Sequence, residues 1–211
     1  MTDKKTTTPP QQVNGALLII SGPSGCGKST LTNEILKIPN VYFSISTTTR
    51  PKRDGEVDGV HYHFVDKEAF LAQVKEGKFL EWAQVHNNYY GTALEPIMNA
   101  LDSGKLVIFD VDVQGHRDIK QYFGANAKSV FITTKNKEIL KNRLQKRQTD
   151  DAQTIEFRLM QAFSEMQHLQ NFDYLIINDD IKSATQAIVS IATSLLYRNT
   201  NQNDELLKNW N

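Results

Sequence analysis

The sequence predicts an α/β fold in which a parallel sheet is covered by helices on both faces. Two observations predict it. Short, continuous apolar runs, such as 16–20 and 106–109, are typical of strands buried on both faces. These runs alternate with segments of helical periodicity, which is the order of a doubly wound parallel sheet.

A glycine-rich turn at 22–29 joins the first predicted strand to a helix over 29–36. It fits the pattern G-x-x-x-x-G-K-[ST] in the strand–turn–helix context that this pattern needs. Glycines allow the backbone to wrap closely around a phosphate, and free N–H groups at the helix start face the anion. We expect Lys28 to reach the β- and γ-phosphates of a nucleotide and Ser29 to bind Mg²⁺. The alternative is a flexible Gly-Ser turn without a ligand. The residues assigned to the phosphate site are Gly22, Pro23, Ser24, Gly25, Cys26, Gly27, Lys28, Ser29 and Thr30.

Composition excludes several classes of protein. The 211 residues include 24 basic and 24 acidic side chains, and this balance argues against nucleic acid or an anionic membrane as a partner. No apolar run approaches the ~20 residues that span a bilayer. The single cysteine, Cys26, fits a reducing cytoplasm, and we interpret it as a small spacer in the loop. Polar residues 1–13 are expected to form a disordered tail and 199–211 a C-terminal tail, while the oligomeric state stays open.

The segment between the first and third core strands is less uniformly apolar than the core strands and includes a polar loop. Pro39-Asn40 ends the first helix, and a second strand is expected over 41–46. Residues 47–92 then read as a small mixed β/α lobe inserted into the core. Its expected parts are a polar loop over 47–59, a strand over 60–65, a helix over 67–76 capped by Asp66 and ended by Gly77, a strand over 79–86, and a turn at 87–88.

The β/α alternation resumes after this lobe and completes the core, 14–46 and 93–198. The expected elements are a helix over 94–101, a strand over 106–109 ended by Asp110, a helix over 114–122, a strand over 129–133, helices over 137–146 and 152–170, a strand over 174–177, and an amphipathic helix from 181. Ligands of such sheets bind at the carboxyl ends of the strands. Both the glycine-rich turn and Asp110 fall at such ends.

The inserted lobe must supply the second substrate, because a phosphate loop specifies a nucleotide but no reaction. Arg50 and Arg53, with Tyr62 and Tyr90, suit a phosphate monoester: guanidinium forks bind its oxygens and phenols add neutral donors. Glu56 lies in the same polar loop and belongs to this set.

Glu81 lies in an apolar strand, where a buried carboxylate needs a partner. Guanine offers two adjacent N–H donors to a carboxylate, whereas adenine presents an acceptor at that edge. Hydroxyls of Ser46 and Thr92 could donate to the guanine O6. Singly, each of these residues also fits a solvated surface charge or a core tyrosine; together they favour GMP as the acceptor.

Taken together, these motifs resemble those of the guanylate kinases, which make GDP from GMP and ATP. The resemblance covers about residues 15–198. The stretches that carry it are Ser21–Thr30, Ser44–Arg50, Asp54–Glu56, Tyr89–Thr92, Asp110–Gly115 and Asn178–Asp180.

The resemblance implies a phosphate-loop NTPase-type core, a GMP-binding lobe at 47–92, and a helical lid at about 143–158 that closes over ATP. It implies that Asp112 joins Ser46, Glu81 and Thr92 around guanine and that Asn178 lies on the adenine or ribose side. It also implies that Arg143, Arg147 and Arg158 gather around the transferring phosphoryl group with Lys28 and Arg50. Asp110, grouped with the GMP site, is expected to contact Mg²⁺-bound water or Lys28. GMP and dGMP are the expected acceptors.

Three stretches depart from the family pattern. Pro51 stands one place earlier than usual between Arg50 and Arg53, Gln148 replaces a common glycine at the lid, and Thr133-Thr134 replaces a Pro-Pro. We expect these changes to affect rates and lid geometry rather than the reaction.

Two other functions stay open at this point. Guanylate-kinase-like modules that bind proteins have lost catalysis, but they typically lack an intact phosphate loop. A related kinase for another phosphate monoester is the second alternative, and Glu81 with Thr92 disfavours it.

Overall fold

The computed structural model describes residues 13–85, 87–146, 151–198 and 207–210. Its main sheet is fully parallel and has the strand order β2-β7-β1-β8-β9. The five strands are β1 (Ala16–Ser21), β2 (Val41–Phe43), β7 (Leu106–Asp110), β8 (Ala127–Thr133) and β9 (Tyr174–Ile177). The α/β class expected from the apolar runs is therefore confirmed.

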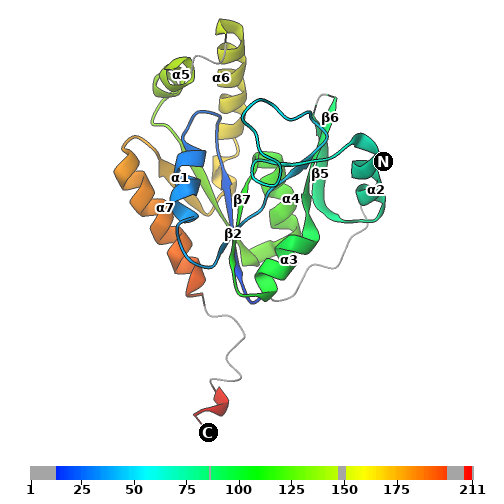
Figure 1. Ribbon diagram of the computed structural model, residues 1–211. Helices are drawn as coiled ribbons and strands as arrows, with labels where there is room; N and C mark the ends of the chain where they lie inside the picture. Colours follow the sequence, from blue (N-terminus) through cyan, green and yellow to red (C-terminus); the bar gives the residue numbers. More distant parts are fainter. Residues whose placement is uncertain (1–12, 86, 147–150, 199–206, 211) are drawn as a thin grey trace.

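Helices cover both faces of this sheet, and successive side chains of β1 pack alternately against the helices of one face and the other. Leu18 and Ile20 pack with the helices α1 (Lys28–Ile35) and α7 (Ile181–Leu196), whereas Leu17 and Ile19 pack with α3 (Leu94–Asp102) and α4 (Val113–Phe123). Figure 1 shows α1 and α7 on one side of the sheet and α3 and α4 on the other. All six residues of β1 are buried, which makes this strand the centre of the core.

Two helices, α5 (Lys137–Lys146) and α6 (Ala152–Met166), rise above the carboxyl end of the sheet (Figure 1). Leu140 and Leu144 of α5 and Leu159 of α6 are buried in the same core as α1. Two short 3₁₀ turns, Gly124–Asn126 and Leu169–Asn171, lead into β8 and toward β9. None of the helices in the described ranges has the length and apolar character needed to cross a membrane.

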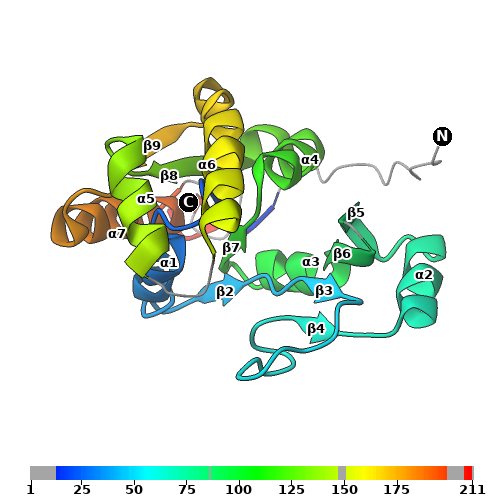
Figure 2. The same ribbon diagram turned by 90° about the horizontal axis from the view of Figure 1, so that it is seen from above.

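A second, mixed sheet lies to one side of the main sheet, as Figure 2 shows, and has the order β4-β3-β6-β5. Its strands are β3 (Thr47–Thr48), β4 (His63–Phe64), β5 (Phe79–Val85) and β6 (Asn88–Ala93), with the helix α2 (Lys67–Lys75). The Asp66 carboxylate caps α2 by accepting from the Ala69 N–H at 2.7 Å, as expected. This sheet falls within the inserted segment; that the segment forms a separate GMP-binding lobe stays a prediction.

Most expected elements are present, and those that differ do so for local reasons. The strand expected at 60–65 is shortened to His63–Phe64, because the His61 backbone N–H bonds to the Val57 carbonyl at 3.0 Å in a turn. The helix expected to reach 170 ends at Met166, and a separate 3₁₀ turn follows at Leu169–Asn171. The strand expected over 41–46 stops at Phe43, and Thr47-Thr48 pairs instead with the second sheet.

Candidate functional site

The phosphate loop follows β1 and has the backbone that its glycines permit. Gly22, Gly25 and Gly27 have φ values of 139°, 90° and 100°, which residues with a Cβ rarely adopt. A Cβ on Gly22 would lie 1.9 Å from the Ile132 carbonyl oxygen of β8. The loop therefore needs glycine both for its dihedral angles and for its close approach to the neighbouring strand.

Lys28 begins α1 and folds back over the loop. Its ammonium donates to the carbonyl oxygens of Gly22 at 2.5 Å and Pro23 at 3.3 Å. Ser29 is exposed at the helix start, where the first N–H groups of a helix have no intrahelical acceptor. Cationic and N–H donors thus converge at the carboxyl end of β1, which is the arrangement that holds the phosphates of a nucleotide.

Asp110 ends β7 directly beside the phosphate loop, since it is paired in register with Ile20 of β1. Burial raises the pKa of the Asp110 carboxyl, and the Lys28 charge acts in the opposite direction. Asp112 caps α4 by accepting from the backbone N–H groups of Gln114 at 3.0 Å and Gly115 at 2.8 Å. The Lys28 charge therefore acts on Asp110, while one oxygen of Asp112 is engaged in capping.

Four of the predicted phosphate-monoester residues form one cluster. Arg50 makes a 2.7 Å ion pair with Glu56, and its guanidinium lies 5.5 Å from the centre of the Tyr62 ring. The rings of Tyr62 and Tyr90 are 6.1 Å apart in an edge-on arrangement. The hydrogen bond from Arg50 lowers the pKa of the partly buried Glu56 carboxyl to about 2, helped by a bond from the Arg53 backbone N–H.

The cluster lies on the side of Asp110. Burial raises the pKa of the Tyr62 phenol, and the charges of Arg50 and Asp110 also act on it. The bond to Glu56 raises the pKa of Arg50, to which Tyr90 contributes. Arg50, Glu56 and Tyr90 thus surround the Tyr62 phenol, and the Asp110 charge also acts on it.

Glu81 and Thr92 are directly opposite each other on β5 and β6. The Thr92 hydroxyl donates to the Glu81 carboxylate at 2.5 Å, and Thr92 is almost completely buried. Ser46 immediately precedes β3, and its carbonyl accepts from the His63 N–H at 2.9 Å. Three of the four residues predicted to face guanine therefore lie in or beside the second sheet, and the fourth, Asp112, lies at the start of α4.

The structure gives hydrogen-bond partners for three of the residues whose roles the resemblance implies. Arg158 of α6 donates to the Ser24 hydroxyl at 3.1 Å. Arg143 of α5 donates to the carbonyl oxygens of Asn178 at 2.7 Å and Cys26 at 3.2 Å. Asn178 is 3% exposed and donates from its side chain to the same Cys26 carbonyl at 2.8 Å. Arg147 and Gln148 lie outside the described residues.

Sequence reasoning missed one carboxylate near the loop. Glu165 follows Arg158 by two turns of α6, and burial raises its pKa while the charges of Lys28 and Asp112 act on it. The spacing of seven residues from Arg158 was the only available signal, because it places both on one helix face.

Oxygen donors near the loop fit Mg²⁺, which prefers hydroxyls, carboxylates and water. Ser29 supplies an exposed hydroxyl at the helix start, and Asp110 supplies a half-buried carboxylate beside Lys28. Within the described ranges no group of three His, Cys, Asp or Glu residues could hold a metal by itself. Ser29 and Asp110 are thus the residues that could hold Mg²⁺ together with the phosphates of a nucleotide.

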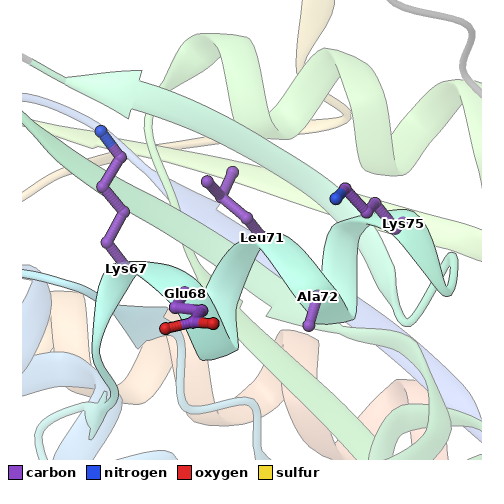
Figure 3. Close-up of a pocket in the computed structure, with 5 residues that line it drawn as sticks. All are labelled: Lys67, Glu68, Leu71, Ala72 and Lys75. Carbon is purple, nitrogen blue, oxygen red and sulfur yellow. The ribbon is translucent and has the colours of Figure 1, made fainter.

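A hollow of about 500 Å³ lies against α2, away from these residues. Figure 3 shows its lining, which comes entirely from this helix: Lys67, Glu68, Leu71, Ala72 and Lys75. It contains none of the residues predicted to bind a nucleotide, and we assign it no part in the site.

Comparisons with known proteins agree with this geometry. Residues 14–195 match the family model described as guanylate kinase. A guanylate kinase of Helicobacter hepaticus is 66% identical over 197 residues, 93% of this chain and 98% of the relative. A guanylate kinase of Helicobacter pylori is 58% identical over 183 residues, 86% and 88% of the two chains. Among solved structures, guanylate kinase from Anaplasma phagocytophilum has a TM-score of 0.74 at 30% identity and covers 94% of this chain and 96% of its own.

Proposed function

The chain belongs to the guanylate kinase family, and from this premise we propose how its residues transfer a phosphoryl group from ATP to GMP. It is an enzyme that phosphorylates GMP with ATP. The observation that carries the assignment of the site is the position of Asp110, paired in register with Ile20 beside the phosphate loop, together with the Arg50–Glu56–Tyr62 cluster of the inserted segment.

The phosphate loop binds the donor. Backbone N–H groups of the loop and of the start of α1 hold the ATP phosphates, and Lys28 leaves the carbonyls of Gly22 and Pro23 to reach the β- and γ-phosphates. Arg158, which already contacts the loop through Ser24, adds positive charge near the transferring group.

The second sheet binds the acceptor. Arg50, Arg53, Tyr62 and Tyr90 hold the GMP phosphate, and Glu56 keeps Arg50 in place through its ion pair. The Glu81 carboxylate accepts from guanine, while Thr92, Ser46 and Asp112 complete the recognition of the base. The same contacts accept dGMP, because none of them requires the ribose 2′-hydroxyl.

We assign Mg²⁺ to Ser29, with Asp110 contacting it through water. The ion would neutralise charge on the transferring phosphoryl group. The attacking GMP phosphate oxygen is already largely anionic at neutral pH, so the chain needs no general base. Its residues act by positioning the two nucleotides and by stabilising negative charge. Closure of the segment 143–158 would exclude water that otherwise hydrolyses ATP.

A panel of acceptors tests this function. Purified protein receives Mg-ATP with GMP, dGMP, AMP, CMP, UMP or no acceptor, and ADP release is measured. We expect turnover with GMP and dGMP and at most trace turnover with the others. Turnover with AMP equal to that with GMP would overturn the assignment of Glu81, and none with any nucleotide would favour a binding module.

The remaining expectations follow from composition. We place the protein in the cytoplasm because its single cysteine fits a reducing compartment, and its balanced charge favours neither nucleic acid nor a membrane surface as a partner.

A further inference from the structure

One peptide of the phosphate loop is held from outside the loop by two side chains. The Cys26 carbonyl oxygen accepts from the Asn178 side-chain nitrogen at 2.8 Å and from the Arg143 guanidinium at 3.2 Å. A carbonyl oxygen only accepts, so the Asn178 amide must turn its NH₂ group toward it. Arg143 also donates to the Asn178 carbonyl at 2.7 Å. Helix α5 and the end of β9 thus meet at a single peptide of the loop.

Holding this carbonyl also fixes the next N–H. A trans peptide is planar, and its C=O and N–H point in opposite directions. The described residues contain no cis peptide bond. With the Cys26 oxygen turned toward Asn178 and Arg143, the Gly27 N–H points away from both side chains. That direction leaves it free for a ligand at the start of α1.

Packing prevents this peptide from rotating. Gly27 has a φ of 100°, and a Cβ there would lie 2.3 Å from the Asn178 amide nitrogen. Asn178 therefore lies directly against the loop backbone. A Cβ on Gly25 would meet the Leu144 side chain at 2.9 Å, so α5 also packs closely on the loop. The loop could change its conformation only by displacing Asn178 or α5.

We propose that Arg143 and Asn178 are positioning residues that orient the Cys26–Gly27 peptide, so that the Gly27 N–H is directed at the donor phosphates. The inference rests on the proposed function in taking the loop as the triphosphate site. It differs from what the resemblance implies, namely that Arg143 contacts the transferring phosphoryl group and Asn178 the adenosine. Two nitrogens of the Arg143 guanidinium donate to backbone carbonyls instead.

Tripolyphosphate, which lacks a nucleoside, distinguishes an effect of Arg143 and Asn178 on phosphate binding from a contact with adenosine. Affinities for Mg-ATP and for Mg-tripolyphosphate are measured by calorimetry, without GMP so that no phosphoryl transfer occurs, for the wild-type chain, Arg143→Lys and Asn178→Ala. The matched controls are Lys141→Ala and Asn142→Ala, which alter exposed neighbours on α5. We expect each site variant to lose about tenfold in affinity for both ligands, because weakening one positioning contact costs about one hydrogen bond. The controls should bind as the wild type does.

Other outcomes overturn the inference in different ways. A loss confined to ATP would place these side chains on the nucleoside, and a lower kcat with unchanged ATP affinity would make Arg143 a catalytic residue. Wild-type protein that binds neither ligand would instead contradict the proposed function. The double variant should lose no more than the weaker-binding single variant, because both side chains act on one peptide; additive losses would contradict a shared role.

NMR spectroscopy tests the orientation of the peptide directly, without a binding assay. The Gly27 amide ¹H–¹⁵N resonance should move in both site variants without ligand and stay in place in both controls. If Asn178→Ala melts below the assay temperature, Asn178→Ser provides the same comparison. An unmoved Gly27 resonance in a folded site variant would show that these residues do not orient the peptide.

Discussion

The Thr92 hydroxyl donates a 2.5 Å hydrogen bond to the Glu81 carboxylate across the β5–β6 pair. This bond occupies Oε1 of Glu81 and fixes the direction of the carboxylate. A carboxylate has about four acceptor positions, so accepting from Thr92 does not by itself prevent Glu81 from accepting further donors. Thr92 therefore orients the group to which we assign the recognition of guanine.

Replacing Glu81 with Gln should weaken GMP binding selectively. The amide retains the shape of the carboxylate, but it is neutral and presents one acceptor where guanine needs two. We expect KM for GMP to rise about 10- to 100-fold, the loss of a hydrogen bond to a charged group, with KM for ATP unchanged. Steady-state kinetics with each substrate varied in turn measure both values. Glu68→Gln on the outer face of α2 is the control, and equal increases in both KM values would remove Glu81 from the acceptor site.

Replacing Arg50 with Lys tests the phosphate-monoester cluster. Lysine keeps the positive charge but cannot form the two parallel hydrogen bonds of a guanidinium fork. It also loses the geometry of the ion pair with Glu56. We expect KM for GMP to rise at least about tenfold and KM for ATP to stay constant. Lys52→Ala, an exposed neighbour, serves as the control; a variant with normal GMP kinetics would contradict the role of Arg50.

Replacing Lys28 with Ala should abolish most activity and leave the fold intact. Its ammonium donates to the loop carbonyls of Gly22 and Pro23, and Lys28 is only partly buried, outside the apolar core. We expect kcat to fall by at least about a hundredfold, as when one group that stabilises transition-state charge is removed. Thermal unfolding should change by only a few degrees. Near-normal turnover would refute the assignment of the donor site.

His116 should make the fold sensitive to mild acid. It is 5% exposed, and its ring stacks on Phe172 with centroids 3.9 Å apart. Burial lowers its pKa to about 4 from 6.5, with Lys120 and Arg117 acting in the same sense and Asp173 against it. Between these two values the unfolded chain binds more protons than the folded one. The contribution is therefore fully present above pH 6.5 and is lost as pH falls toward 4.

Chemical denaturation at several pH values checks this prediction. We expect the free energy of unfolding to fall by at most about 3 kcal/mol across that window because of His116. The variant His116→Gln should be less stable at neutral pH, because it loses the ring contact, but its stability should depend less on pH. An equally steep dependence in the variant would assign the effect to another group.

The sequence was sufficient wherever a pattern is local. The glycine spacing of 22–29 places the phosphate loop, and the apolar run before Asp110 places that carboxylate at a strand end, because both depend on neighbours along the chain. The surroundings of Arg143 and Asn178 could not be predicted, since their shared acceptor lies in a loop more than a hundred residues away. Glu165 was missed for the same reason: its proximity to Lys28 depends on how α6 packs over the sheet.

The contacts of Lys28 also bear on selectivity among anions. Its ammonium donates to the Gly22 and Pro23 carbonyls. A ligand must therefore replace both of these acceptors before it gains the attraction of the lysine. A triphosphate chain can place one phosphate on Lys28 while its other phosphates engage the N–H groups of the loop, whereas inorganic phosphate must use a single group for both. The loop should consequently bind the triphosphate of ATP more tightly than inorganic phosphate.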